Sequence, residues 1–209
     1  MDRLLQYFIL IIAITFCGHG MAQSSTPKVL LNTDLGEIVI ELYPEAASVT
    51  VDNFIKYVED HFYDGVIFHR VIKDFMIQTG GHTFDLTFKK PNRAAIVNES
   101  SNGLKNLRGT VAMARTSAPN SATSQFFINH KDNAFLDYQE KRHGYAVFGK
   151  VVKGMDTVDK IATAETERRR PFANIPKQII RIKTARLLDS KTQAPASKPT
   201  EKTKTVQAK

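Results

Sequence analysis

The stretch GVIFHRVIKDFMIQTGG, residues 65–81, contains two short runs rich in Val, Ile, Phe and Met, separated by Lys73 and Asp74. Short apolar runs that are bounded by glycine and joined by polar residues are typical of neighbouring β-strands connected by a turn. Three further segments of the same kind follow, namely GTVAMAR, SQFFINH and YAVFGKVV. The centre of the chain is therefore predicted to consist of short β-strands.

The sequence before this region predicts a hairpin and a helix. In KVLLNTDLGEIVIELY, the apolar runs Val29–Leu31 and Ile38–Leu42 flank a Thr-Asp-Leu-Gly turn, which is a hairpin pattern. Apolar residues then recur at helical spacing over residues 50–61, with Ser48 or Thr50 as the N-cap.

The sequence after it predicts a second helix in GMDTVDKIATA and a last, half-exposed strand in KQIIRIKTARLL. The basic run Glu167–Arg170 between them precedes Pro171 and is predicted to be a loop. Eight strands and two helices predict a mainly β fold, a closed eight-stranded antiparallel β-barrel capped by two α-helices, because closure removes the exposed sheet edges. A β-sandwich is the alternative.

An export signal peptide is predicted over residues 1–22. Arg3 precedes the apolar run Leu4–Phe16, which is short for a membrane span, and small residues at positions 20 and 22 fit a cleavage before Gln23. An uncleaved anchor, a buried helix and a lipoprotein signal at Cys17 are the alternatives, and the large residue before that cysteine argues against the last. Cleavage would remove the only cysteine, leaving no disulfide and no thiol.

The net charge of +8 is unevenly distributed along the chain. Residues 191–209 carry five lysines and one acid among Pro, Thr, Ala and Gln, which predicts a basic disordered tail after a domain that spans residues 27–190. Neither this tail nor the basic run at 167–170 is interleaved with aromatic residues. Binding to nucleic acid is therefore not expected.

The chain lacks the common motifs of metal-dependent, cofactor-dependent and nucleophilic catalysis. HExxH, CxxC, GxGxxG, Walker and GxSxG sequences are absent, and the six histidines are scattered. No two histidines lie two or four residues apart beside a carboxylate, so neither a metal nor a cofactor is expected.

Polar residues on otherwise apolar strands are the unusual feature. If GVIFHRVI alternates as a strand, Arg70 shares its face with Phe68 and Ile72. Composition alone favours a solvated or structurally paired arginine. Gln78 and Gln125 are also polar residues on apolar strands. Each alone is better explained as a structural amide whose hydrogen bonds are made within the fold.

The order and spacing of these segments are more specific than any one of them. FHRVIKDFMIQTGG, GTVAMART, SATSQFFIN and HGYAVFGKVVKGMD occur in the order in which the cyclophilin family of peptidyl-prolyl cis–trans isomerases carries similar motifs. The chain resembles that family from about residue 29 to residue 188. The resemblance implies the family's eight-stranded barrel with two helices and an isomerase that needs neither metal nor covalent intermediate.

The resemblance also assigns roles to residues of this chain. Arg70 matches the catalytic arginine, which would donate toward the prolyl nitrogen as the amide bond rotates. The remaining expected substrate-binding residues are the proline pocket Phe75, Met76, Phe127 and Leu136, the backbone-binding amides Gln78 and Gln125, and the groove-lining Ala114 and Arg115.

Two positions depart from the animal members of the family. Phe135 stands where those proteins carry the tryptophan associated with cyclosporin binding, which predicts weak inhibition by that drug. Tyr145 replaces their pocket histidine, and its hydroxyl still supplies a donor. AMART and the signal peptide resemble the exported bacterial branch, which implies a periplasmic, or fully secreted, monomer that acts on proline-containing exported polypeptides. A proline-directed binding module or chaperone, and a surface adhesin using the basic tail, are the alternative functions.

Overall fold

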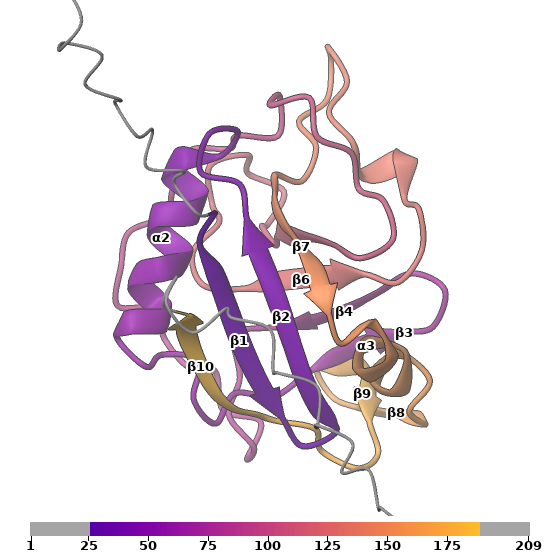
Figure 1. The fold of residues 1–209 in the computed structure, drawn as a ribbon. Helices are drawn as coiled ribbons and strands as arrows, with labels where there is room; N and C mark the ends of the chain where they lie inside the picture. Colours follow the sequence, from indigo (N-terminus) through magenta and orange to yellow (C-terminus); the bar gives the residue numbers. More distant parts are fainter. Residues whose placement is uncertain (1–25, 189–209) are drawn as a thin grey trace, which may run out of the picture.

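The computed structural model describes residues 26–188, which contain two α-helices, a short 3-10 helix and ten strands (Figure 1). The predicted signal peptide and the predicted tail lie outside this range. The elements are β1 (Lys28–Thr33), β2 (Gly36–Leu42), α2 (Ser48–Glu59), β3 (Arg70–Ile72), β4 (Met76–Thr79), β5 (Thr110–Met113), β6 (Phe126–Asn129), η1 (Ala134–Leu136), β7 (Val147–Lys153), α3 (Met155–Ala162), β8 (Thr166–Arg169), β9 (Phe172–Pro176) and β10 (Ile182–Leu188).

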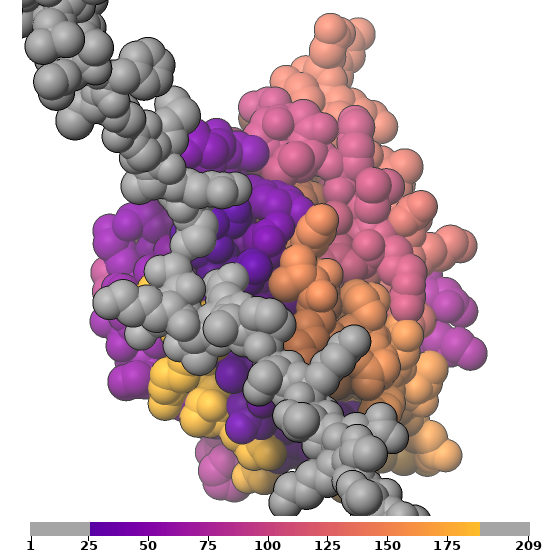
Figure 2. Space-filling view, in the orientation of Figure 1, coloured from indigo at the N-terminus to yellow at the C-terminus, as the bar shows by residue number. Residues whose placement is uncertain are grey.

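Eight of the strands form one antiparallel sheet in the order β10-β1-β2-β7-β5-β6-β4-β3. In the space-filling view, the yellow, indigo and orange residues of β10, β1, β2 and β7 follow one another across the visible face (Figure 2). The mainly β prediction with two helices is confirmed, and a single eight-stranded sheet argues against the sandwich alternative.

The prediction of a closed barrel is wrong, because β10 and β3 remain the edges of an open sheet. The chain before β3 does not continue as a regular strand. Val66 forms an isolated bridge with Thr83, whereas the next residue, Ile67, forms one with Arg181. Because successive residues pair with different partners, no ladder forms along this seam, although single backbone hydrogen bonds cross it, such as that from the Ile182 amide to the Val66 carbonyl (2.8 Å).

The predicted hairpin at residues 28–43 is confirmed. β1 and β2 pair in register up to Thr33 and Gly36, and the Thr33 hydroxyl donates to the Gly36 carbonyl (2.6 Å). Gly36 adopts φ +136°, a conformation that favours glycine. Alternate residues such as Leu31 and Ile38 are fully buried in the core, and each such side chain contributes roughly 1.5–3 kcal/mol to folding.

The helix α2 covers nearly the predicted residues but is capped differently. Its N-cap is Ala47, with no capping hydrogen bond from that side chain, so neither Ser48 nor Thr50 fills this position. The carboxylate of Glu99, distant in sequence, accepts hydrogen bonds from the amides of Val49 (3.1 Å) and Thr50 (2.7 Å). A negative group at this end is favourable because the first amides of a helix lack partners within it.

The predicted loop at Glu167–Arg170 is mostly a strand. β8 pairs with β9 in a separate two-stranded sheet, with Arg169 opposite Phe172. The sequence of β8, TERR, contains no apolar alternation, so the pairing depends on its better-patterned partner. Within residues 26–188, no helix is both long enough and apolar enough to cross a membrane.

Candidate functional site

A second apolar cluster lies apart from the main core, on strands β4, β5, β6 and β7. Register places side chains of neighbouring strands together, because Phe127 of β6 pairs with both Gln78 of β4 and Ala112 of β5. The cluster consists of buried Met76, Ala112, Phe127, Leu136 and Val147, with Ile72, Phe75, Leu104, Ala114 and Tyr145 packed against it. Its partly buried members leave an apolar surface that is open to a ligand.

The cluster forms the floor of a hollow of about 260 Å³. Ten of the eleven side chains expected at the site line it, and they come from widely separated parts of the sequence. They are Arg70, Phe75, Met76, Gln78, Ala114, Arg115, Phe127, Phe135, Leu136 and Tyr145. The eleventh, Gln125, does not line the hollow, but its Oε1 accepts a hydrogen bond from the Gln78 side-chain amide (3.0 Å).

Arg70 begins β3, where its side chain extends over this hollow. Its Nη1 donates to Gln78 Oε1 at 3.3 Å and lies 3.8 Å from the Met76 sulfur. The guanidinium carbon lies 5.6 Å from the centroid of the Phe75 ring, within the range of a cation–π contact. The Arg70 guanidinium is therefore held only by weak contacts with uncharged side chains.

No carboxylate pairs with Arg70 among the ion pairs of residues 26–188, and none lines the hollow. Partial burial lowers the pKa of Arg70, and Tyr145 opposes this shift. An arginine still remains protonated at neutral pH. The site consequently presents an uncompensated cation with most of its five donors free, beside apolar walls.

Arg115 lines the same hollow but uses its donors differently. Its guanidinium donates to the carbonyls of His143 (2.6 Å) and Gly144 (3.1 Å), and it lies 4.6 Å from the centre of the Tyr145 ring. These bonds fix the segment before β7 against the end of β5. Arg115 therefore shapes the wall, whereas Arg70 has donors available for a ligand.

Aromatic rings form the remaining walls. Phe75 stacks on Phe135 with ring centroids 5.6 Å apart, and Phe127 meets Tyr145 edge to face at 5.6 Å. Phe135 is 56% exposed, so its ring can contact a bound molecule at the rim. Flat apolar walls of this kind suit a compact apolar ring.

A buried polar network supports these walls, and sequence reasoning missed it. The Asn133 side-chain amide donates to the Phe75 carbonyl (2.9 Å) and to Asn129 Oδ1 (2.8 Å). Asn129 donates in turn to Asn106 Oδ1 (3.2 Å), and Asn106 donates to Asp137 Oδ1 (3.0 Å), next to Leu136. The available signal was asparagine at the end of an apolar strand, where a buried amide requires partners.

His69, which precedes Arg70, is not among the residues that line the hollow. It is buried, and its ring packs on that of His82 with centroids 4.5 Å apart. Burial, followed by the charge of His82, lowers the pKa of His69 from 6.5 to about 4, so the ring is neutral at pH 7. The expectation that Phe68 shares a face with Arg70 is wrong, because Phe68 belongs to the main core.

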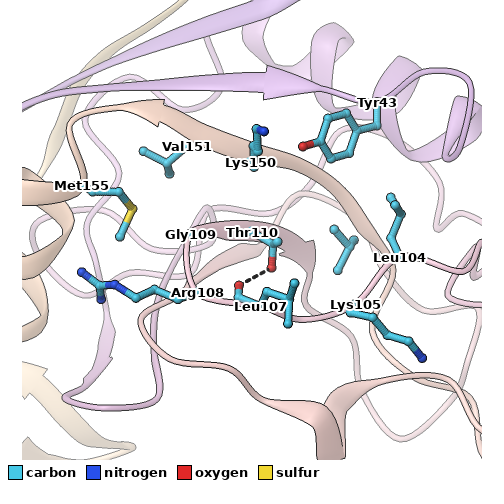
Figure 3. Close-up of a pocket in the computed structure, with 11 residues that line it drawn as sticks. Tyr43, Leu104, Lys105, Leu107, Arg108, Gly109, Thr110, Lys150, Val151 and Met155 are labelled. Carbon is cyan, nitrogen blue, oxygen red and sulfur yellow. Dashed lines mark hydrogen bonds between the residues drawn. The ribbon is translucent and has the colours of Figure 1, made fainter.

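A larger hollow of about 460 Å³ lies elsewhere, between Tyr43, Leu107 and Met155 (Figure 3). None of the expected site residues lines it. Two of its polar groups are occupied, since the Thr110 hydroxyl donates to the Leu107 carbonyl (2.7 Å, Figure 3) and Arg108 pairs with Asp159 (2.7 Å). The smaller hollow is the better candidate because ten of the eleven expected residues line it, whereas none of them lines the larger hollow.

Comparison with known proteins gives a consistent result. Residues 28–187 match the family described as cyclophilin type peptidyl-prolyl cis-trans isomerase/CLD. The chain is 47% identical to peptidyl-prolyl cis-trans isomerase A of Dickeya dadantii, over 89% of this chain and 97% of that protein. It is 54% identical to a peptidyl-prolyl cis-trans isomerase of Acinetobacter baylyi, over 78% and 85% of the two chains.

Solved structures show the same likeness at the level of the fold. A cyclophilin type peptidyl-prolyl cis-trans isomerase of Cryptosporidium parvum, crystallised in the presence of the dipeptide Ala-Pro, is 26% identical with a TM-score of 0.65. The match covers 78% of this chain and 99% of that one.

Proposed function

Because the chain belongs to the cyclophilin-type peptidyl-prolyl cis–trans isomerases and is an enzyme of this kind, we propose that Arg70 is its catalytic residue and that the hollow beside it holds the proline of an Xaa-Pro segment. The observation that carries this proposal is the guanidinium without a carboxylate partner above an apolar floor. The Ala-Pro dipeptide present with a related structure supports the choice of ligand.

The reaction requires rotation about an amide bond, not proton or electron exchange. Amide resonance imposes a barrier of ~18–20 kcal/mol, and uncatalysed Xaa-Pro isomerisation takes tens to hundreds of seconds. Resonance is lost as the prolyl nitrogen becomes pyramidal and regains its lone pair. A donor directed at that nitrogen stabilises the twisted state more than either planar isomer, and each ~1.4 kcal/mol of this preference accelerates rotation tenfold.

Each part of the site has a task in this mechanism. Arg70 donates to the prolyl nitrogen and holds the substrate carbonyl. The pocket formed by Phe75, Met76, Phe127 and Leu136 holds the proline ring, while Gln78 binds the substrate backbone with support from Gln125. Tyr145 supplies a hydroxyl at the pocket edge. No covalent intermediate is needed.

The test is a peptide isomerisation assay on the purified chain. Wild type should accelerate the cis-to-trans conversion of a short Xaa-Pro peptide, and Arg70→Ala should remove most of the acceleration. Arg70→Lys should also lose activity, since lysine keeps the charge but not the planar fork. Arg168→Ala, at an exposed arginine of β8, is the matched control and should retain full activity. Full activity of Arg70→Ala would contradict the assignment. Suppression of aggregation that survives a loss of turnover would favour the binding-module alternative.

We also propose that the enzyme works as a monomer on exported proteins in the periplasm. The support is the predicted signal at residues 1–22, together with the bacterial origin of the named relatives. The test is to express the chain in a Gram-negative host, to fractionate the cells, and to measure the mass of the recovered protein. The expected product is a periplasmic chain that begins at Gln23. A chain in the medium would indicate full secretion, and an uncleaved cytoplasmic chain would contradict the proposal.

A further inference from the structure

The turn between β3 and β4 has a backbone conformation that its sequence does not favour. It is closed by a hydrogen bond from the Phe75 amide to the Ile72 carbonyl (3.2 Å), and its third residue, Asp74, has φ +55°. Turns with a positive φ at this position usually carry glycine there, because a Cβ is disfavoured in the left-handed region. Another residue type persists in this conformation only where the surrounding structure holds it.

His130, the residue after β6, holds this turn with both its side chain and its backbone. Its Nδ1 accepts a hydrogen bond from the Asp74 amide (3.0 Å), and its own amide donates to the Phe75 carbonyl (2.9 Å). The register of β4 and β6 ends at Met76 and Asn129, so the imidazole continues the hydrogen bonding beyond the last pair of the ladder. Because the imidazole is only 9% exposed, water competes little for this bond, although the Asp74 side chain is 70% exposed.

Contacts on the other side of the imidazole fix its tautomer. Since Nδ1 accepts a hydrogen bond, the proton of the neutral ring is on Nε2, which lies 3.1 Å from Asp159 Oδ1 of α3. Arg108 donates to both oxygens of that carboxylate (2.7 and 2.9 Å) and to the His130 carbonyl (2.7 Å). The ring is therefore oriented with its acceptor directed at the turn.

The conformation of this turn determines two parts of the candidate site. Phe75 contributes the ring that stacks on Phe135 (centroids 5.6 Å apart) and lies 5.6 Å from the guanidinium carbon of Arg70. The same turn sets the register of β3 and β4, in which Arg70 lies opposite Gln78. A different turn conformation would displace the pocket wall and the guanidinium relative to each other.

We propose that His130 is a positioning residue for the isomerase reaction: its Nδ1 holds Asp74 in the left-handed conformation and thereby keeps Phe75 in place for the twisted amide. This inference rests on the proposed function of the site. His130 does not line the hollow, so it acts through the turn and not by touching the substrate. Loss of the bond should lower kcat more than it changes KM, because a displaced wall loses complementarity to the transition state while the apolar floor still binds the planar isomers.

The experiment compares two substitutions of His130 that are similar in size. Asparagine has Oδ1 where the imidazole has Nδ1, so His130→Asn keeps an acceptor for the Asp74 amide, whereas His130→Leu removes it. His130→Leu should lower kcat for a short Xaa-Pro peptide on the order of tenfold, with KM within about twofold of wild type. His130→Asn should retain most of the wild-type kcat. Circular dichroism and urea unfolding check that each protein is folded in the assay.

A glycine substitution separates the role of the turn from general stability. Glycine adopts a positive φ without help, so Asp74→Gly should restore kcat to the His130→Leu variant. His61→Gly in the same variant is the matched control, because His61 has φ +54° shortly after α2 and a side chain that is 62% exposed. This control should not restore kcat.

Hydrogen exchange in the wild type tests the bond directly, even if His130→Leu does not fold. The Asp74 amide should exchange more slowly than that of the neighbouring Lys73. An unchanged kcat of His130→Leu, no rescue by Asp74→Gly, equal rescue by His61→Gly, or rapid exchange of the Asp74 amide would overturn the inference. A wild type without isomerase activity would instead refute the proposed function.

Discussion

His69→Gln should reduce the sensitivity of the fold to acid. In the folded protein the pKa of His69 is about 4, because burial and the nearby His82 disfavour its charged form, whereas the ordinary value is 6.5. Between these two values the unfolded chain binds a proton that the folded chain does not. The free energy of unfolding therefore falls as the pH falls through this window and is highest above pH 6.5. The difference corresponds to a loss of about 3 kcal/mol at pH 4, a large part of the ~5–15 kcal/mol of a typical domain.

Urea unfolding followed by circular dichroism at pH 7, 5.5 and 4 measures this effect. Since glutamine does not titrate, the variant should lose about 3 kcal/mol less than wild type between pH 7 and pH 4, whatever its stability at pH 7. Parallel pH profiles of His69→Gln and wild type would show that His69 is not the buried neutral group that the geometry indicates.

Three further substitutions test separate parts of the structure. Asn133→Ala removes the amide that donates to the Phe75 carbonyl, so the unfolding free energy should fall by about 2 kcal/mol in urea and kcat should decline, while unchanged values would contradict a supporting role. Glu99→Ala should cost about 1 kcal/mol by removing the acceptor of the Thr50 amide, with a smaller loss for Glu99→Gln in the same measurement. Phe135→Trp should strengthen inhibition of isomerisation by cyclosporin on the order of tenfold through a new indole donor at the rim, and equal inhibition of both proteins would exclude that explanation.

The sequence predicted the strands well where apolar residues alternate and poorly where pairing depends on distant residues. Val29–Leu31 and Ile38–Leu42 carry their own pattern and turn, and both lie in the predicted hairpin. The strand β8 has no such pattern and pairs only because β9 lies beside it. The cap of α2 comes from Glu99, about fifty residues away, which no local motif can indicate.

The candidate site, too, was predicted only in part from the sequence. Composition favoured a solvated or paired Arg70, and only the order of several motifs indicated that distant segments meet around it. The structure brings those segments together through the register of β4 and β6, where Gln78 lies opposite Phe127. The network through Asn129 and Asn133 could not be predicted in this way, because a buried amide is recognised only when its partners are known.

The contrast between the free cation and the fixed walls has a mechanistic consequence. The Phe75 carbonyl accepts hydrogen bonds from both the His130 amide (2.9 Å) and the Asn133 side chain (2.9 Å), so the ring that faces the proline is held from behind. Arg70 makes only long contacts to Gln78 and Met76, so a substrate can engage its donors without breaking a strong bond. Complementarity to a twisted amide requires this combination, since a mobile wall would fit the planar isomers as well as the transition state. Substitutions at the supporting amides should therefore lower stability and turnover together, whereas substitutions of Arg70 should lower turnover alone.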